Sequence, residues 1–366
     1  MKILFITNYF HPVQGGVENH VYNLSKELIK LGHSVEVWCS DRSRDNIILK
    51  NEDLVGKIKI RRFPALFKVG DFGVIFPGIF SELRNNNFDI IHVHVYRHLH
   101  NLIPLFTRTA CILTPHWPNY PKNLRSRTTN FLIEIFDNIL GKFILDKYKK
   151  ILCITDLEKE WFIKKFKIKK SKLIIIPNGV SKKDLIKKDK KITKVKNVLS
   201  LGRQHRSKGF DQVIKIAKFF PDVNFIIAGA EDNDTERLKN LASKNTKILT
   251  NISEKQKKSL LKKADIFIHP SHYEGFGIVI LEAFASKIPV IASNKGGIPW
   301  VVGKAGLIFE DNNLKDLKNK LELLTKNNEL RKELSEKGYK RVKNFTWKKI
   351  VLGLEKTYNH TLFKFS

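Results

Sequence analysis

The sequence predicts an α/β protein made of two doubly wound domains, and three observations support this class. Short apolar runs typical of buried strands alternate along the chain with apolar residues at helical spacing. The alternation begins twice, and residues 181–196, which contain eight lysines, separate the two series. With 366 residues, the chain is long enough for two domains that each bury a core.

The first series of elements fills the amino-terminal half of the chain. Its strands and helices alternate in the manner of a parallel sheet with helices on both faces. Strands are expected at 3–7, 33–37, 89–94, 111–114, 151–155 and 173–176, and helices at 17–31, 130–147 and from Asp156 onward. Residues 41–87 show no clear pattern and receive no assignment.

The second series begins after the lysine-rich stretch. Strands are expected at 198–201, 223–228, 248–253, 264–269, 289–292 and 305–309. Helices are expected from Phe210, from Asp234 as a capping residue, from Glu254, at 278–285, twice more before Asn344, and from Trp347. The expected division is a first domain at 1–180, a linker at 181–196, a second domain at 197–345 and a terminal helix at 346–366.

The composition excludes several classes of protein. No run of 18 apolar residues occurs, so no transmembrane helix is expected. Residues 1–10 contain Thr7 and Asn8 and lack a small-residue cleavage site, so they are interpreted as a first strand and not as a signal peptide. The three cysteines, Cys39, Cys111 and Cys153, lie in or near apolar runs, which is typical of buried thiols in a reducing cytoplasm.

The net charge of +31 favours acidic partners. No nucleic-acid-binding motif occurs, so no nucleic acid is expected, whereas each lysine near a membrane adds about 1 kcal/mol of attraction to an anionic leaflet. Lys122, Arg125 and Arg127 precede the apolar helix expected at 130–147, as in enzymes that lie on a bilayer. We therefore expect a cytoplasmic protein that attaches peripherally to an anionic membrane surface; a compositional bias toward lysine is the alternative.

The most informative stretch is residues 269–282. An apolar strand is followed by a loop with Gly275 and Gly277 and then by an apolar helix. Free N–H groups at such a helix start bind anions, and glycine lets the chain approach a phosphate closely. Glu274 and Glu282 frame this site. Because carboxylates repel phosphate, the two are expected to accept hydrogen bonds from hydroxyl groups, and the pattern predicts a phosphate flanked by sugars.

A structural interpretation of the two glutamates stays open beside this one. In it, Glu274 caps the helix and Glu282 pairs with a nearby lysine. The intervening glycines favour the functional interpretation. A carboxylate among apolar residues is also costly without a partner, so Glu282 requires an explanation.

This stretch resembles the Glu-x7-Glu signature of retaining glycosyltransferases of the GT-B fold, specifically glycosyltransferase family 4. The resemblance covers nearly the whole chain and includes the glycine pair Gly15-Gly16, the turn at 177–180 and the loop at 202–209. It implies two facing Rossmann-like domains with a deep cleft between them. Two positions depart from the family pattern: Ser181 stands where Asp is usual, and Trp300 where Glu is usual.

The resemblance also implies how a donor is bound. Arg203 and Lys208 hold the leaving diphosphate in place of a metal ion, Glu274 lies by the donor sugar, and Glu282 binds the ribose hydroxyls. No metal and no cofactor are expected. Glycine loops and the helix start complete the expected donor site: Gly15, Gly16, Gly202, Gly275, Phe276, Gly277 and Ile278.

Histidines gather in the first domain. His116, at a strand end, is similar to the family's cleft histidine, which the resemblance places near the donor sugar as a catalytic residue. His92, His94, His98 and His100 lie within nine residues, which also suggests zinc. No acidic or cysteine ligand with suitable spacing accompanies them, so roles in packing or on the acceptor side are favoured.

The sequence therefore predicts a hexosyltransferase-type enzyme that moves a sugar from a nucleotide-sugar to an acceptor hydroxyl with retention at the anomeric carbon. A sugar or a lipid-linked glycan precursor at the cytoplasmic membrane face is the expected acceptor. Two alternatives stay open: a nucleotide-sugar 2-epimerase of the same fold, and a catalytically silent basic adaptor that binds acidic lipid or nucleic acid. Spacing does not specify the nucleotide or the sugar.

Overall fold

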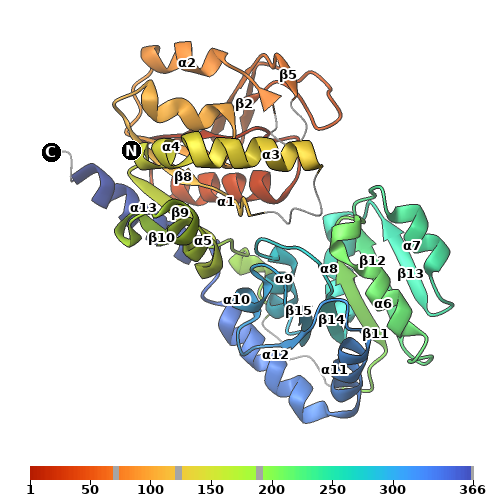
Figure 1. Cartoon of the computed structure of the whole chain (residues 1–366). Coiled ribbons are helices and arrows are strands. Elements are labelled where there is room, and N and C mark those ends of the chain that lie inside the picture. The colour runs from red at the N-terminus through yellow and green to blue at the C-terminus, as the bar shows by residue number, and fades with distance from the viewer. Residues whose placement is uncertain (69–73, 120–125, 187–192, 364–366) are drawn as a thin grey trace. The chain divides into compact units, whose positions relative to one another are not determined.

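The chain folds into two compact units (Figure 1). Unit 1 combines residues 1–178 with residues 347–366, and unit 2 is residues 179–346. The computed structural model describes all residues except 69–73, 120–125, 187–192 and 364–366. In the described part of the chain, no helix is both long enough and apolar enough to span a bilayer.

Unit 1 is built on an eight-stranded sheet with the order β10-β9-β8-β7-β1-β2-β4-β3. All neighbouring strands are parallel except β3 and β4. The central strands are buried on both faces, as in sheets covered by helices on each side. The strands are β1 (Lys2–Ile6), β2 (Ser34–Ser40), β3 (Glu52–Val55), β4 (Ile58–Phe63), β7 (Ile90–His94), β8 (Ala110–Thr114), β9 (Lys150–Cys153) and β10 (Leu173–Ile175).

The helices of unit 1 cover this sheet with apolar faces. Helix α1 buries Val21, Leu24 and Leu28 at the spacing of one helix face. Helix α13 packs beside α1 although the two lie at opposite ends of the sequence (Figure 1). The helices are α1 (Gly16–Lys30), α2 (Gly78–Glu82), α3 (Arg127–Phe136), α4 (Lys142–Lys147), α5 (Asp156–Phe166) and α13 (Trp347–Phe363).

Two segments of unit 1 differ from the sequence-based expectation. The single helix expected at 130–147 is α3 and α4 joined by a π-helical stretch at Asp137–Gly141. The unassigned residues 41–87 contain β3, β4, α2 and a small hairpin of β5 (Phe67–Lys68) and β6 (Val74–Ile75). The three cysteines are buried and free, as expected.

Unit 2 holds a six-stranded, fully parallel sheet with the order β13-β12-β11-β14-β15-β16. The strands are β11 (Asn197–Leu201), β12 (Asn224–Gly229), β13 (Thr246–Thr250), β14 (Ile266–His269), β15 (Val290–Ser293) and β16 (Leu307–Phe309). The helices are α6 (Phe210–Ala217), α7 (Thr235–Leu241), α8 (Glu254–Lys263), α9 (Ile278–Ala285), α10 (Ile298–Val302), α11 (Leu314–Lys326) and α12 (Asn328–Val342). The prediction of two doubly wound α/β units is confirmed.

The strand order of each unit reverses at one place. In unit 2, β12 lies on one side of β11 and β14 on the other; in unit 1, β2 lies on one side of β1 and β7 on the other. The connections that leave the carboxyl ends of such neighbouring strands diverge to opposite sides and leave room for a ligand. The fold therefore directs attention to the loops that follow β11 and β14, and to those that follow β1, β7 and β8.

Candidate functional site

The loops after β11 and β14 bring two predicted site residues of unit 2 into direct contact. Lys208 Nζ lies 2.5 Å from Glu274 Oε2, and His269 Nε2 lies 3.6 Å from the same oxygen. Burial by itself raises the pKa of Glu274, but the Lys208 ammonium and the neighbouring His269 hold it well below its ordinary value. Glu274 is therefore an ionised carboxylate whose partner is a cation at the edge of the sheet.

The start of α9 is open to an anion. Its N-cap residue is Gly277, at φ 84°, and no side chain in the described part of the chain caps the helix. Since the first N–H groups of a helix have no partner within it, they face the loop after β14. The alternative in which Glu274 caps this helix is wrong, because its carboxylate binds Lys208.

A second glycine fixes the position of Glu274. Gly296 has φ 56°, and a Cβ there would lie 2.0 Å from the carbonyl oxygen of Glu274. The N–H of Gly297 donates to the same oxygen at 2.9 Å. The sequence shows this Gly-Gly pair but gives no sign of what it supports. Gly296 and Gly297 therefore belong to the candidate site, which the prediction missed.

The two carboxylate oxygens of Glu282 fit different interpretations of the sequence, one the structural and the other the functional interpretation. Its Oε1 lies 2.8 Å from Lys257 Nζ, which is the lysine pairing of the structural alternative. Its Oε2 is buried and has no hydrogen-bond partner among the residues that the structure describes. Burial raises the pKa of Glu282 and Lys257 opposes that rise. A buried carboxylate oxygen without a partner is costly, and a hydroxyl group of a ligand would satisfy it.

Arg203 stands apart from this cluster. Its side chain is 61% exposed, and its Nε lies 3.3 Å from Asp232 Oδ2. The neighbouring Asp234 occupies the N-cap position of α7, as expected, but it does not cap the helix with its side chain. Its carboxylate instead accepts from Arg237 at 2.6 and 2.8 Å. The two aspartates therefore bind arginines.

In unit 1 the candidate residues include a group of neutral histidines. His94 Nδ1 lies 3.0 Å from His116 Nε2, and His20 Nδ1 lies 2.6 Å from the side-chain oxygen of Asn178. Burial lowers the pKa of His20 to about 4, and burial with the neighbouring histidines lowers the pKa of His94 and His116 well below the ordinary value. His116 is therefore a neutral imidazole whose Nε2 is already engaged by His94.

The ring nitrogens of the same three histidines are placed as metal ligands would be. Ligating atoms of His20, His94 and His116 lie within 4.8 Å of one another, the one such group among the described residues. Neutral imidazoles are the form that binds metals. His92 does not belong to this group, because its ring nitrogens bond to Tyr358 and Thr114 at 2.7 Å each.

Four residues with strained backbones surround a pocket of about 150 Å³ beside His116. Val95, Arg97, His116 and Trp117 have φ values of 69°, 71°, 57° and 59°. Non-glycine residues rarely adopt this conformation, and each instance costs on the order of 1–3 kcal/mol. Such strain persists only where surrounding contacts enforce it, and it gathers at functional sites. The sequence could not reveal it, because no glycine marks these positions.

Two buried carboxylates bind two of these four residues, Trp117 and Arg97. Glu158, in the first turn of α5, accepts from the N–H of Trp117 and, at 2.6 Å, from that of Ile154. Burial raises the pKa of Glu158 to about 7, and these backbone hydrogen bonds oppose the rise. Asp137 accepts from Arg97 through Nε at 2.9 Å and Nη2 at 2.7 Å. None of these supporting residues was predicted.

The glycine loop after β1 lies against a further ion pair. Glu18 Oε1 lies 2.6 Å from Arg44 Nη2, and a Cβ on Gly15 would lie 2.3 Å from Glu18 Oε2. A side chain at Gly15 would therefore displace the ends of the Glu18 and Arg44 side chains, whereas Gly16 has open space around it. The predicted residues Gly15, Gly16 and His116 all belong to unit 1, and the remaining predicted site residues belong to unit 2.

Two family models match the chain, one in each half. The model described as Glycosyltransferase Family 4 matches residues 14–183, and the one described as Glycosyl transferases group 1 matches residues 181–341.

Relatives and solved structures give the same picture. The chain is 29% identical to an uncharacterised glycosyltransferase of Methanocaldococcus jannaschii over 98% of both chains. It is 27% identical to the GPI3 subunit of Saccharomyces cerevisiae phosphatidylinositol N-acetylglucosaminyltransferase, over 86% of this chain and 73% of the relative.

Sucrose-phosphate synthase of Thermosynechococcus elongatus has a similar structure, with a TM-score of 0.80, 18% identity and 100% of each chain covered. Anabaena HepE, in complex with UDP and glucose, gives a TM-score of 0.72 and 15% identity, over 98% of this chain and 100% of its own. These likenesses show the GT-B fold.

Proposed function

The chain belongs to the group 1 and family 4 glycosyltransferases, and we propose that it moves a sugar from a nucleotide-sugar to an acceptor hydroxyl with retention at the anomeric carbon. One observation carries this proposal: the Lys208–Glu274 pair lies beside an uncapped helix start, at the point where the strand order of unit 2 reverses. A cation and free N–H groups suit a diphosphate there.

The donor is assigned from the same residues. Lys208 exchanges part of its contact with Glu274 for the diphosphate, and Glu274 then accepts from hydroxyls of the donor sugar. The free Oε2 of Glu282 accepts from a ribose hydroxyl. Arg203 turns from Asp232 toward the diphosphate, which its exposed position permits. A uridine nucleotide is the first donor to test, because the Anabaena relative was crystallised with UDP.

The proposed reaction is a displacement on one face of the donor sugar. The bond between the anomeric carbon and the phosphate oxygen breaks, and the acceptor oxygen forms its bond to that carbon on the same face. The proton of the acceptor hydroxyl passes to the departing phosphate oxygen. Lys208 and Arg203 stabilise the negative charge that develops on the diphosphate, and neutral His116 hydrogen-bonds to the sugar or the acceptor. This set of cations performs the role of a metal ion.

We further propose a lipid-linked acceptor at an anionic membrane surface. The helical stretch of α3 to α4 exposes a row of large apolar side chains on unit 1: Phe131, Leu132, Ile135, Ile139, Leu140 and Phe143. Thr129 and Ile133 of α3 also line the pocket beside His116, so one helix adjoins both surfaces. The net charge of +31 suits an anionic leaflet. Lys122 and Arg125 lie outside the described residues.

Calorimetry with UDP, GDP and ADP tests the donor assignment. We expect one nucleotide to bind the wild-type protein and Glu282→Ala to weaken it about tenfold, the usual cost of one charged hydrogen bond. Glu254→Ala is the matched control, because Glu254 binds the same Lys257 at 3.0 Å but is 77% exposed. Binding of no nucleotide would refute the proposal. Release of an epimeric nucleotide-sugar without acceptor would favour the epimerase alternative.

Flotation with vesicles of phosphatidylcholine and phosphatidylglycerol tests the membrane assignment. We expect wild-type protein to float with the vesicles at physiological salt and Ile139→Glu to remain in solution, because it places a charge within the apolar row. Leu323→Glu, at an exposed apolar position of unit 2, is the control. Equal flotation of all three proteins, or of none, would contradict this assignment.

A further inference from the structure

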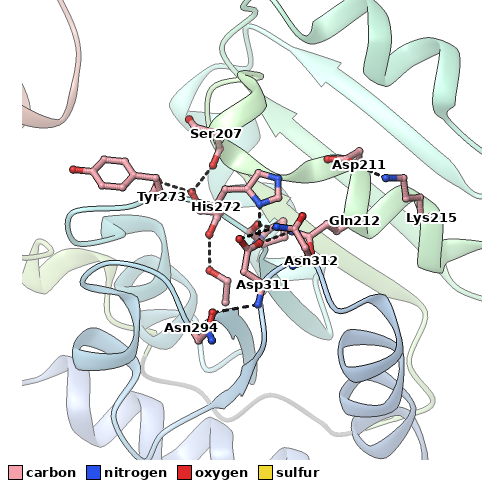
Figure 2. Close-up of polar contacts among 12 residues, drawn as sticks. Ser207, Asp211, Gln212, Lys215, His272, Tyr273, Asn294, Asp311 and Asn312 are labelled. Carbon is pink, nitrogen blue, oxygen red and sulfur yellow. Dashed lines mark hydrogen bonds and ion pairs between the residues drawn. The ribbon is translucent and has the colours of Figure 1, made fainter. Parts of the chain in front are cut away.

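A histidine and an aspartate of unit 2 join two loops next to the Lys208–Glu274 pair. His272 Nδ1 lies 2.7 Å from Asp311 Oδ1 (Figure 2). His272 belongs to the loop after β14, and Asp311 follows β16. The side chain of Asp311 is 4% exposed and that of His272 is 27% exposed. An ion pair shielded in this way is stronger than one at the surface and holds its geometry more firmly.

The main chain of His272 supports the loop that carries Lys208. The N–H of His272 donates to the carbonyl oxygen of Ser207 at 2.9 Å, and Ser271 Oγ donates to the same oxygen at 3.1 Å. Ser207 directly precedes Lys208. The position of His272 therefore fixes the main chain from which the Lys208 side chain extends toward Glu274.

Gln212 of α6 joins these loops from the other side (Figure 2). Its Nε2 donates to Pro270 O at 3.0 Å and to Asp311 Oδ1 at 3.1 Å, and its Oε1 accepts from the N–H of Asn312 at 2.9 Å. Gly209 allows this packing. A residue with a side chain at this position would place its Cβ 2.3 Å from the carbonyl oxygen of Pro270, and the φ of 62° also favours glycine. The loops after β11, β14 and β16 are thus held as one body.

We propose that His272 and Asp311 are positioning residues that hold Lys208 in place for the donor diphosphate. The inference rests on the proposed function of that site. Both residues act through the loop after β11: Asp311 fixes the His272 side chain, and His272 fixes Ser207 through its main chain. A loosened loop lets Lys208 spread over several positions, which weakens its contact with phosphate more than it weakens any contact with the nucleoside.

The charge on His272 gives the proposal a second observable. The hydrogen bond that Asp311 accepts from His272 raises the pKa of His272, burial opposes this rise, Asp211 adds to it, and Lys215 reduces it. The pair is therefore strongest when His272 is protonated, below its raised pKa. Because the pKa in the folded state lies above that in the unfolded state, the stabilisation is present at low pH and is lost as the pH rises through the folded value.

Calorimetry on His272→Gln and Asp311→Asn tests the proposal. The nucleoside diphosphate that binds wild-type protein, among UDP, GDP and ADP, is compared with its monophosphate. We expect the Kd for the diphosphate to rise about tenfold in both variants, and that for the monophosphate to change less than about twofold. The ratio between variant and wild-type Kd should shrink from pH 6 to pH 8.5. Glutamine keeps a donor toward Asp311, so His272→Gln is expected to fold, and its melting temperature is measured alongside.

His33→Gln is the matched control, because His33 makes a similar pair with Glu355 at 2.8 Å in unit 1. An unchanged diphosphate affinity in the folded variants would overturn the positioning role, and so would equal losses for the monophosphate and the diphosphate. If no nucleotide binds wild-type protein, the proposed function fails first and this inference fails with it. The two failures are therefore distinguishable.

Discussion

The candidate residues of unit 2 and those of unit 1 reach tight backbone geometry by different means. Around Glu274 in unit 2, the close approaches fall on glycines: Gly277 starts α9, and Gly296 lies where a side chain would collide with Glu274. In unit 1, residues such as Val95 and His116 take the left-handed conformation with their side chains present. Glycine adopts this conformation without strain, whereas the other residues must be held in it.

The electrostatics differ in the same way. The residues of unit 2 are ionised and paired, with Lys208 on Glu274 and Lys257 on Glu282. His20, His94 and His116 of unit 1 are buried and neutral. The comparison indicates that unit 2 is suited to holding charge on a diphosphate, and unit 1 to presenting hydrogen-bonding groups to uncharged hydroxyls. Four substitutions would break or sharpen this comparison.

The largest effect is expected from Glu274→Ala. The rate of transfer should fall by about a thousandfold or more, because the donor sugar loses the carboxylate that accepts its hydrogen bonds and Lys208 loses its partner. Nucleotide affinity should change little, since Lys208 stays free to bind phosphate. A turnover assay and calorimetry on one preparation check both statements. Unimpaired turnover would refute the role of Glu274.

Gly296→Ala tests whether glycine is essential in unit 2. A Cβ at 2.0 Å from the carbonyl oxygen of Glu274 and a φ of 56° should together lower the free energy of unfolding by about 2–4 kcal/mol and reduce turnover. Gly353→Ala in α13 is the control, because a Cβ there would make an ordinary contact with Ile176 Cδ1 at 3.8 Å, and a gain of about 0.5–1 kcal/mol is expected. Chemical denaturation measures both. Equal stability of the two variants would show that position 296 does not require glycine.

Glu158→Gln tests the carboxylate that holds Trp117. The pKa of Glu158 in the folded protein, about 7, exceeds its ordinary value of 4.5. Its contribution to stability is therefore complete below pH 4.5 and is lost as the pH rises through 7, a change of about 3 kcal/mol. The variant should gain stability relative to wild type between pH 5 and pH 8. Parallel melting curves across that range would show that Glu158 does not titrate as stated.

The smallest effect is expected from Val95→Gly. Glycine removes the strain at φ 69° but adds chain entropy to the unfolded state, so stability should change by less than about 1 kcal/mol. Turnover should fall several-fold, because the loop beside His116 loses its single conformation. Steady-state kinetics with thermal melting check this. A variant that is both markedly less stable and fully active would show that the strain has no functional part.

The difference between the units also explains what the sequence could predict. The two α/β series and the Glu274 to Glu282 motif are visible because apolar periodicity and glycine record the backbone directly. The support of Trp117 by Glu158 is invisible in the sequence, because the contact joins residues far apart in the chain and no residue type marks the strain. The pairing of Arg203 with Asp232 is hidden for the same reason. In a chain of net charge +31, a functional arginine looks like any other.

Helix α13 has a consequence for the order in which the protein is completed. Its residues Trp347, Val351 and Tyr358 belong to the same core as β1 and α1, and Tyr358 bonds to His92 in the middle of the unit 1 sheet. Along the sequence, unit 2 (residues 179–346) is inserted between the two segments that form unit 1. A ribosome therefore releases all of unit 2 before it supplies the last helix of unit 1. During synthesis the nascent amino-terminal sheet exposes apolar surface for longest, and a chaperone has most reason to bind it there.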